Sequence, residues 1–169
     1  GVDTMSRVLN PLDQRTYPLF GDGAGAVLLG PGRADQGLVA YTLGSDGSGA
    51  ELLIRRIGGS RFPPSLALME DNEHFLDMDG RAVFKWAIKL FGHMIPPLLD
   101  YAGMTIDEID LWVLHQSNLR IIEHVAQDLG IDRDRCVVNL DRYGNTTAGS
   151  IPLALDEVVA QGRVARGQH

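Results

Sequence analysis

Two short apolar runs, each followed by a polar residue and a helical pattern, constrain the fold of this chain more than any other feature. The first run, Leu111–Leu114, is followed directly by His115. The second, Val137–Leu140, is followed a few residues later by Asn145. Helical patterns lie before, between and after the two runs, with short connections, so we expect parallel strands joined by right-handed crossovers. In such folds ligands bind outside the carboxyl ends of the strands, where His115 and Asn145 stand.

Three helices are predicted around these strands. From Gly80, apolar residues recur at spacings of three and four, which indicates a helix with one broad apolar face that ends at Gly103. Pro96 and Pro97 should kink or restart this helix, because proline cannot donate the backbone hydrogen bond. The second helix is expected over residues 118–129, closed by Gly130, and the third over about 147–161.

The first half of the chain reads differently. Gly21, Gly23 and Gly25 alternate, but they lead into the apolar run Val27–Leu29 instead of opening a helix, as a dinucleotide-binding fingerprint would. We therefore favour strands joined or bulged by small residues, with other backbone packed closely against them, over a phosphate site. Residues 37–43 indicate a further strand, and residues 44–77 a loop-rich excursion over the surface.

Composition limits the classes of protein to which the chain can belong. The net charge of −7 disfavours general nucleic-acid binding. No run of 18 apolar residues predicts a membrane span, and no signal peptide is recognisable, so we expect a cytoplasmic protein. The single cysteine, Cys136, excludes an internal disulfide framework and fits a reducing compartment. Since the chain starts at Gly1 and ends abruptly at His169, we expect it to be a piece of something larger.

His115 and Asn145 are the candidate catalytic residues. Taken alone, His115 could be a structural histidine, and Asn145 could be a turn residue. Taken together, they can present two N–H donors to one carbonyl oxygen and so stabilise an enolate or oxyanion. The spacing of the other histidines predicts no metal site. A nucleophile is lacking, because Cys136 has the context of a packing residue and the serines Ser117 and Ser150 lack the nucleophile-elbow motif.

Several stretches resemble the beta-ketoacyl-acyl-carrier-protein synthase III family, whose members are condensing enzymes with the thiolase fold. The stretches are His115–Arg120, Tyr143–Pro152, Phe20–Ala26, Gly80–Lys85 and the tail from Leu155 to Gln168. The resemblance implies an α/β, thiolase-like layered fold with a mixed sheet and helices on its faces. It also implies that residues 1–169 are the second half of a duplicated fold, with residues 1–15 connecting from a first half and the last strands following residue 169.

The family's chemistry implies roles for individual residues. A cysteine in the first half takes an acyl group from acyl-CoA, and malonyl-acyl carrier protein then decarboxylates and attacks that thioester. His115 and Asn145 would donate hydrogen bonds to the malonyl thioester oxygen. No cofactor and no metal are implied. The full enzyme would be a homodimer, and this chain alone would be inactive because it lacks the cysteine.

The resemblance also implies binding residues. Four positions match residues that line the pantetheine channel of the family: Gly80, Phe84, Asn118 and Ile121. Lys85 and Arg120 match basic residues near the channel mouth, where the acidic carrier protein docks, although both could be ordinary solvated helix charges. Two alternatives stay open: a related condensing enzyme of secondary metabolism, and a non-catalytic partner subunit with the same fold.

Overall fold

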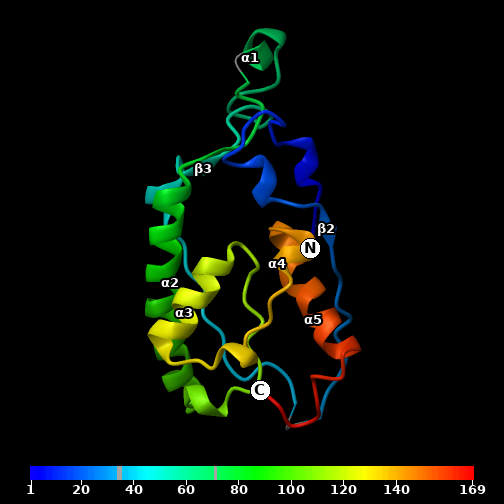
Figure 1. The fold of residues 1–169 in the computed structure, drawn as a ribbon, viewed down its shortest axis with the longest axis vertical. Coiled ribbons are helices and arrows are strands. Elements are labelled where there is room, and N and C mark those ends of the chain that lie inside the picture. Colours follow the sequence, from blue (N-terminus) through cyan, green and yellow to red (C-terminus); the bar gives the residue numbers. More distant parts are fainter. Residues whose placement is uncertain (34–35, 71) are drawn as a thin grey trace.

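The structure is a computed structural model that describes residues 1–33, 36–70 and 72–169, so Asp71 of the expected loop-rich stretch lies outside it. Its helices are α1 (Leu66–Glu70), α2 (Gly80–Ala102), α3 (Leu119–Leu129), α4 (Leu140–Tyr143) and α5 (Ser150–Ala160). Its strands are β1 (Val2–Asp3), β2 (Gly23–Ala24), β3 (Leu53–Ile54) and β4 (Asp77–Met78). Short 3-10 turns cover Met5–Arg7, Tyr17–Leu19, Gly47–Gly49, Ile106–Glu108, Arg133–Arg135 and Thr147–Gly149. In Figure 1, α2 and α3 lie side by side, α4 and α5 lie across from them, and α1 projects at one end.

The main hydrophobic core lies between α2 and α3. Buried residues of α3 and of the segments that flank it meet Ile95 of α2: Trp112, Ile121, Ile122, Val125, Ala126, Ile131 and Cys136. The caps that end these helices are those expected, since Gly103 and Gly130 both adopt the left-handed conformation, with φ of 68° and 69°. The apolar spacing of residues 80–102 and 118–129 therefore predicted both helices correctly.

Of the two effects expected from Pro96 and Pro97, a kink or a restart of the helix, the restart does not occur. The helix continues through both residues to Ala102. A proline removes the hydrogen bond to the carbonyl four residues before it, which here belongs to Gly92 and His93. Both of these residues are exposed, so water can replace the missing donors.

The two predicted parallel strands are present as one short parallel contact. Trp112 pairs with Cys136, the Trp112 amide donates to the Arg135 carbonyl at 2.8 Å, and the Val137 amide donates to the Trp112 carbonyl at 2.9 Å. The second run is shorter than predicted, because Leu140 already belongs to α4. A smaller core, formed by Val137, Ala154 and Val158, packs this segment against α5.

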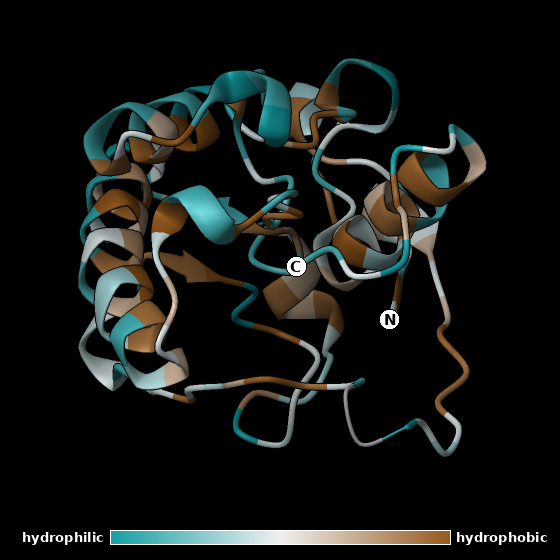
Figure 2. Cartoon of the chain, turned by 90° about the horizontal axis from the view of Figure 1, so that it is seen from below, coloured by the Kyte–Doolittle hydropathy of each residue, from teal (hydrophilic) through white to brown (hydrophobic). Residues whose placement is uncertain are grey.

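The first half of the chain has fewer paired strands than the sequence predicts. Within the described residues, β1 pairs only with β2 and β3 only with β4, both antiparallel. The apolar stretch Val27–Leu29 and residues 37–43, expected to be strands, have no strand partner in the described chain. Leu28 and Leu43 are 100% and 88% exposed. Figure 2 accordingly shows hydrophobic stretches in extended segments at the periphery of the chain. A strand needs a neighbour to complete its hydrogen bonds, and no described segment supplies one here.

None of the helices in the described part of the chain has an apolar stretch of the length that a bilayer requires.

Candidate functional site

His115 lies at the end of the first apolar run and is held by α5. Its Nδ1 lies 2.6 Å from the hydroxyl oxygen of Ser150, the first residue of that helix. Ser150 is buried, with 1% of its surface exposed, and its hydroxyl oxygen also accepts the Gln116 backbone N–H at 3.4 Å. We assign the neutral tautomer of His115 with its proton on Nε2. In this tautomer the Ser150 hydroxyl donates to Nδ1 while it accepts the Gln116 N–H.

The protonation state of His115 agrees with that arrangement. Burial lowers the pKa of His115 below its usual value of 6.5, because the charged ring loses its hydration. The imidazole is therefore neutral at pH 7 and can donate through Nε2. Among the described residues, Nε2 makes no hydrogen bond, so that donor remains available to a ligand.

Asn145 is fixed by its own backbone and by the turn that follows it. Its backbone N–H donates to the Leu19 carbonyl at 2.9 Å, and its carbonyl accepts from the Gly21 N–H at 3.0 Å. The side-chain oxygen Oδ1 accepts the Thr147 N–H at 2.9 Å. A backbone N–H can only donate, so this contact identifies the oxygen of the amide and fixes the orientation of the group. The Nδ2 amino group has no hydrogen-bond partner among the described residues and is available as a second donor.

The alternating glycines explain how the Asn145 turn is packed. A Cβ atom on Gly21 would lie 2.0 Å from the Tyr143 carbonyl oxygen, and one on Gly23 would lie 2.6 Å from Thr146 Cβ. A Cβ on Gly25 would lie 2.6 Å from Pro152. Alternate residues of an extended segment face one side, so all three glycines allow residues 143–152 to approach the backbone closely. The sequence interpretation of close backbone packing is confirmed.

Gln116 is a structural residue that sequence reasoning did not single out. It is fully buried, and its Nε2 donates to the carbonyls of Leu114 and Val137 at 2.8 and 3.0 Å. Its Oε1 accepts the Asn139 N–H at 3.1 Å. The side chain thus extends the parallel contact beyond Trp112 and fixes the backbone on which His115 stands. The sequence signal available for it was its position directly after the apolar run Leu111–Leu114 and His115.

The six predicted binding residues fall into three groups. Phe84 and Ile121 belong to the core between α2 and α3, Ile121 as a buried residue and Phe84 as a partly buried one. Gly80 begins α2, and Asn118 caps α3 by accepting the Arg120 N–H at 2.9 Å. The side chains of Lys85 and Arg120 are exposed on α2 and α3. The two helices bring these residues to one part of the chain, but only Ile121 and Phe84 share a described cluster.

Cys136 is a packing residue, as its context predicted. It is buried in the core between α2 and α3, and burial raises the pKa of its thiol. A buried, protonated thiol is a poor nucleophile. No group of three or more metal-binding side chains occurs in the described parts of the chain.

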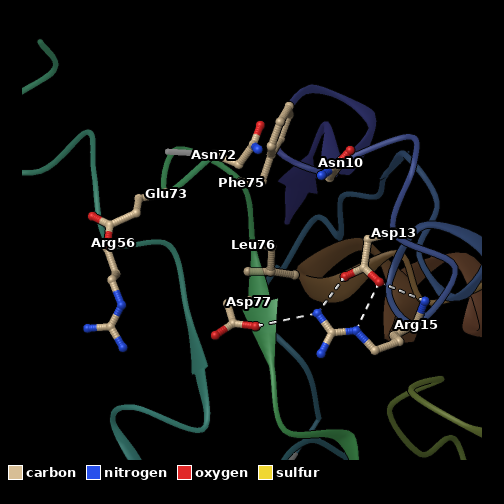
Figure 3. Close-up of a pocket in the computed structure, with 9 residues that line it drawn as sticks. All are labelled: Asn10, Asp13, Arg15, Arg56, Asn72, Glu73, Phe75, Leu76 and Asp77. Carbon is tan, nitrogen blue, oxygen red and sulfur yellow. Dashed lines mark hydrogen bonds and ion pairs between the residues drawn. The ribbon is translucent and has the colours of Figure 1, made fainter. Parts of the chain in front are cut away.

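Two cavities lie next to Arg15. The first, of about 260 Å³, is drawn in Figure 3, where Arg15 reaches Asp13 at 3.0 Å and Asp77 at 3.9 Å. None of the predicted site residues lines it. The second, of about 570 Å³, contains Gly80 and Leu19. Because the Leu19 carbonyl accepts the Asn145 N–H, this second cavity adjoins the segment that carries Asn145.

Comparison with known proteins connects this geometry to one family. Residues 99–169 match the family model "3-Oxoacyl-[acyl-carrier-protein (ACP)] synthase III C terminal", and residues 1–47 match "3-Oxoacyl-[acyl-carrier-protein (ACP)] synthase III". The beta-ketoacyl-[acyl-carrier-protein] synthase III of Rhodopirellula baltica is 44% identical over an alignment 185 residues long, gaps included, that covers 99% of this chain and 54% of that protein.

Solved structures agree. Synthase III from Pseudomonas aeruginosa PAO1 is 39% identical with a TM-score of 0.87, over 99% of this chain and 50% of that one. The enzyme from Aquifex aeolicus VF5 is 34% identical with a TM-score of 0.87, over the same shares. The fold is therefore the expected thiolase-like α/β fold, and the chain spans about half the length of the curated relatives it matches. On these grounds the chain belongs to the beta-ketoacyl-[acyl-carrier-protein] synthase III family.

Proposed function

We propose that this chain supplies the two hydrogen-bond donors of the malonyl site in a 3-oxoacyl-[acyl-carrier-protein] synthase III. In the proposed reaction, a cysteine outside the chain holds the acyl group from acyl-CoA as a thioester. Malonyl-acyl carrier protein loses CO₂, and the electrons of the broken C–C bond move onto its thioester oxygen. His115 Nε2–H and Asn145 Nδ2–H donate to this enolate oxygen. The carbanion then attacks the acyl thioester, and the cysteine leaves as a thiolate.

The observation that carries the proposal is that each donor has its other polar atom occupied by the protein. Nδ1 of His115 faces the Ser150 hydroxyl, and Oδ1 of Asn145 accepts the Thr147 N–H. Each side chain can therefore present only an N–H to a ligand, as the stabilisation of a developing negative oxygen requires. The lowered pKa of His115 serves the same end, because it keeps the ring neutral while Nε2 keeps its proton.

Substrate binding is proposed for the residues around the N-termini of α2 and α3. The pantetheine arm would run past Gly80, Phe84, Asn118 and Ile121. Lys85 and Arg120 would face the acidic carrier protein, since their exposed charges are basic on a chain of net charge −7. Local basic residues are needed if an acidic partner is to bind a protein that is acidic overall.

The assembly is also a proposal. We expect the complete synthase to be a cytoplasmic homodimer in which all 169 residues belong to the second half of the duplicated fold. Buried and unpaired Cys136 supports a reducing compartment. Gel filtration of the complete enzyme tests the dimer.

The test separates the two half-reactions in the complete synthase. His115→Ala and Asn145→Ala should each lower malonyl decarboxylation by about 10²–10³-fold, the usual cost of removing one such donor. Transfer of the acyl group from acyl-CoA to the cysteine should change much less. Equal losses in both half-reactions would contradict the assigned roles. The chain of 169 residues alone should show no condensation, and measured turnover would refute the division of the site between two halves.

A further inference from the structure

Asp3 reaches the turn that carries Asn145 from the opposite end of the chain. Its Oδ2 accepts the Thr147 hydroxyl in a short hydrogen bond and the Ala148 N–H at 3.1 Å. Thr147 is also the residue whose backbone N–H holds Oδ1 of Asn145 at 2.9 Å. We propose that Asp3 is a positioning residue that orients the Asn145 amide through Thr147. This inference rests on the proposed role of Asn145 as a donor.

Thr147 needs such support because its backbone is strained. Its φ is +47°, a left-handed conformation that a β-branched residue rarely adopts. Strained residues of this kind persist only where surrounding contacts hold them. The carboxylate of Asp3 accepts from both the Thr147 hydroxyl and the Ala148 N–H, so it restrains the side chain of Thr147 and the peptide bond that follows it. If Thr147 relaxed, its N–H would turn away from Oδ1 and release the amide of Asn145.

Asp3 itself is fixed by β1. This strand pairs with β2, with Asp3 opposite Gly23, and Gly23 packs directly against Thr146. The strand pair thus packs against the same turn from which Asp3 accepts two hydrogen bonds. The hydrogen bond from Thr147 lowers the pKa of Asp3 below its usual 3.8, so the carboxylate is ionised at neutral pH. An ionised acceptor forms stronger hydrogen bonds than a neutral one.

The experiment is a double-mutant cycle in the complete synthase, with malonyl decarboxylation as the readout. Asp3→Ala should lower kcat about five- to thirty-fold, as expected for losing one or two hydrogen bonds, and kcat/KM by the same factor, because the donor acts on the developing enolate. In an Asn145→Ala background, Asp3→Ala should have almost no further effect. Asp3→Asn should lower kcat only about two- to five-fold, since an amide oxygen can accept both hydrogen bonds but more weakly than a carboxylate.

Two further variants make the cycle decisive. Thr147→Val removes the hydroxyl that donates to Asp3 while keeping the shape of the side chain, and should cause a smaller loss than Asp3→Ala, because the Ala148 N–H still donates to Asp3. It replaces Asp3→Ala if that variant does not fold. Glu108→Ala is the control, because Glu108 accepts the Thr105 N–H and hydroxyl at 2.7 and 2.8 Å in a different turn. It should leave decarboxylation unchanged.

The outcomes separate this inference from the proposed function. If Asn145→Ala does not impair decarboxylation, the proposed function itself is wrong. If Asn145→Ala impairs it but Asp3→Ala does not, or if the two losses multiply, Asp3 does not act through Asn145 and only the positioning role is refuted. Loss in Asp3→Asn equal to that in Asp3→Ala would likewise overturn it.

Discussion

The contact between His115 and Ser150 allows a prediction whose magnitude follows from the structure. Ser150→Ala removes a buried hydroxyl that lies 2.6 Å from Nδ1 of His115 and 3.4 Å from the Gln116 backbone nitrogen. Both groups lose a partner in a region where water has little access, so the free energy of unfolding should fall by about 1–3 kcal/mol. The protein should still fold, because an alanine leaves only a small cavity at this position.

The effect of Ser150→Ala on the reaction should be smaller than that of removing His115. The hydroxyl only orients the ring and favours the tautomer with its proton on Nε2. A neutral hydrogen bond contributes a net 0.5–1.5 kcal/mol, so decarboxylation should fall by roughly 2- to 13-fold. Loss of the whole donor in His115→Ala should cost about 10²–10³-fold. The pKa of His115 should rise, because the serine proton can bind only the neutral ring nitrogen.

Three measurements test this prediction. Urea unfolding gives the stability, malonyl decarboxylation by the complete synthase gives the rate, and NMR titration of the His115 ring protons gives the pKa. Ser48→Ala is a matched control, since its hydroxyl also makes a 2.6 Å hydrogen bond, to Asp46, but in an exposed turn. The control should change none of the three. The reasoning is refuted if Ser150→Ala leaves both the rate and the pKa of His115 at their original values.

Three other predictions follow from single contacts. Burial holds the pKa of His115 below 6.5, so the unfolded chain binds more protons than the folded one as pH falls through 6.5, and the folded protein loses stability. His115→Gln should therefore reduce the loss of stability between pH 7.5 and 5.5, as measured by urea unfolding. Gly23→Ala should lower the melting temperature, because its Cβ would lie 2.6 Å from Thr146 Cβ, at a cost of about 1–3 kcal/mol. Gly44→Ala, where a Cβ would meet nothing within 4 Å, should leave it unchanged. Gln116→Leu should cost about 3–9 kcal/mol in urea unfolding, since three backbone groups each lose their partner at about 1–3 kcal/mol. A smaller loss would refute the structural role given to Gln116.

Helices whose signal is local could be predicted from the sequence. The helix α3 has apolar residues on one face, Asn118 as its cap and Gly130 beyond its end, and each of these signals acts within a few residues. The parallel contact of Trp112 with Cys136 was predictable for a related reason, because a helix joins the two segments with short connections. Here local pattern and tertiary structure agree.

The end of the second apolar run was not predictable, because a distant side chain decides it. The run continues through Leu140 in the sequence and so predicted a strand, yet the backbone turns at Asn139 and Leu140 begins α4. The Asn139 N–H donates to Gln116, and the Asn139 side chain donates to Glu157 of α5 at 3.0 Å. These partners lie 23 and 18 residues away, beyond the reach of any local pattern. The residues that support His115 and Asn145 were missed for the same reason.

The support of the two donors is concentrated in one short segment. Residues 145–150 carry Asn145, hold its amide through Thr147, and end at Ser150, which holds the ring of His115. The segment is itself fixed by Asp3 and by the close approach of Gly23. Within this segment each donor nevertheless has its own support, because Asp3 acts on Asn145 through Thr147 whereas the Ser150 hydroxyl contacts the ring of His115 directly. Asp3→Ala and Ser150→Ala should therefore lower decarboxylation by factors that multiply in the double variant. A double variant that loses clearly less than this product would mean that Asp3 also acts on His115.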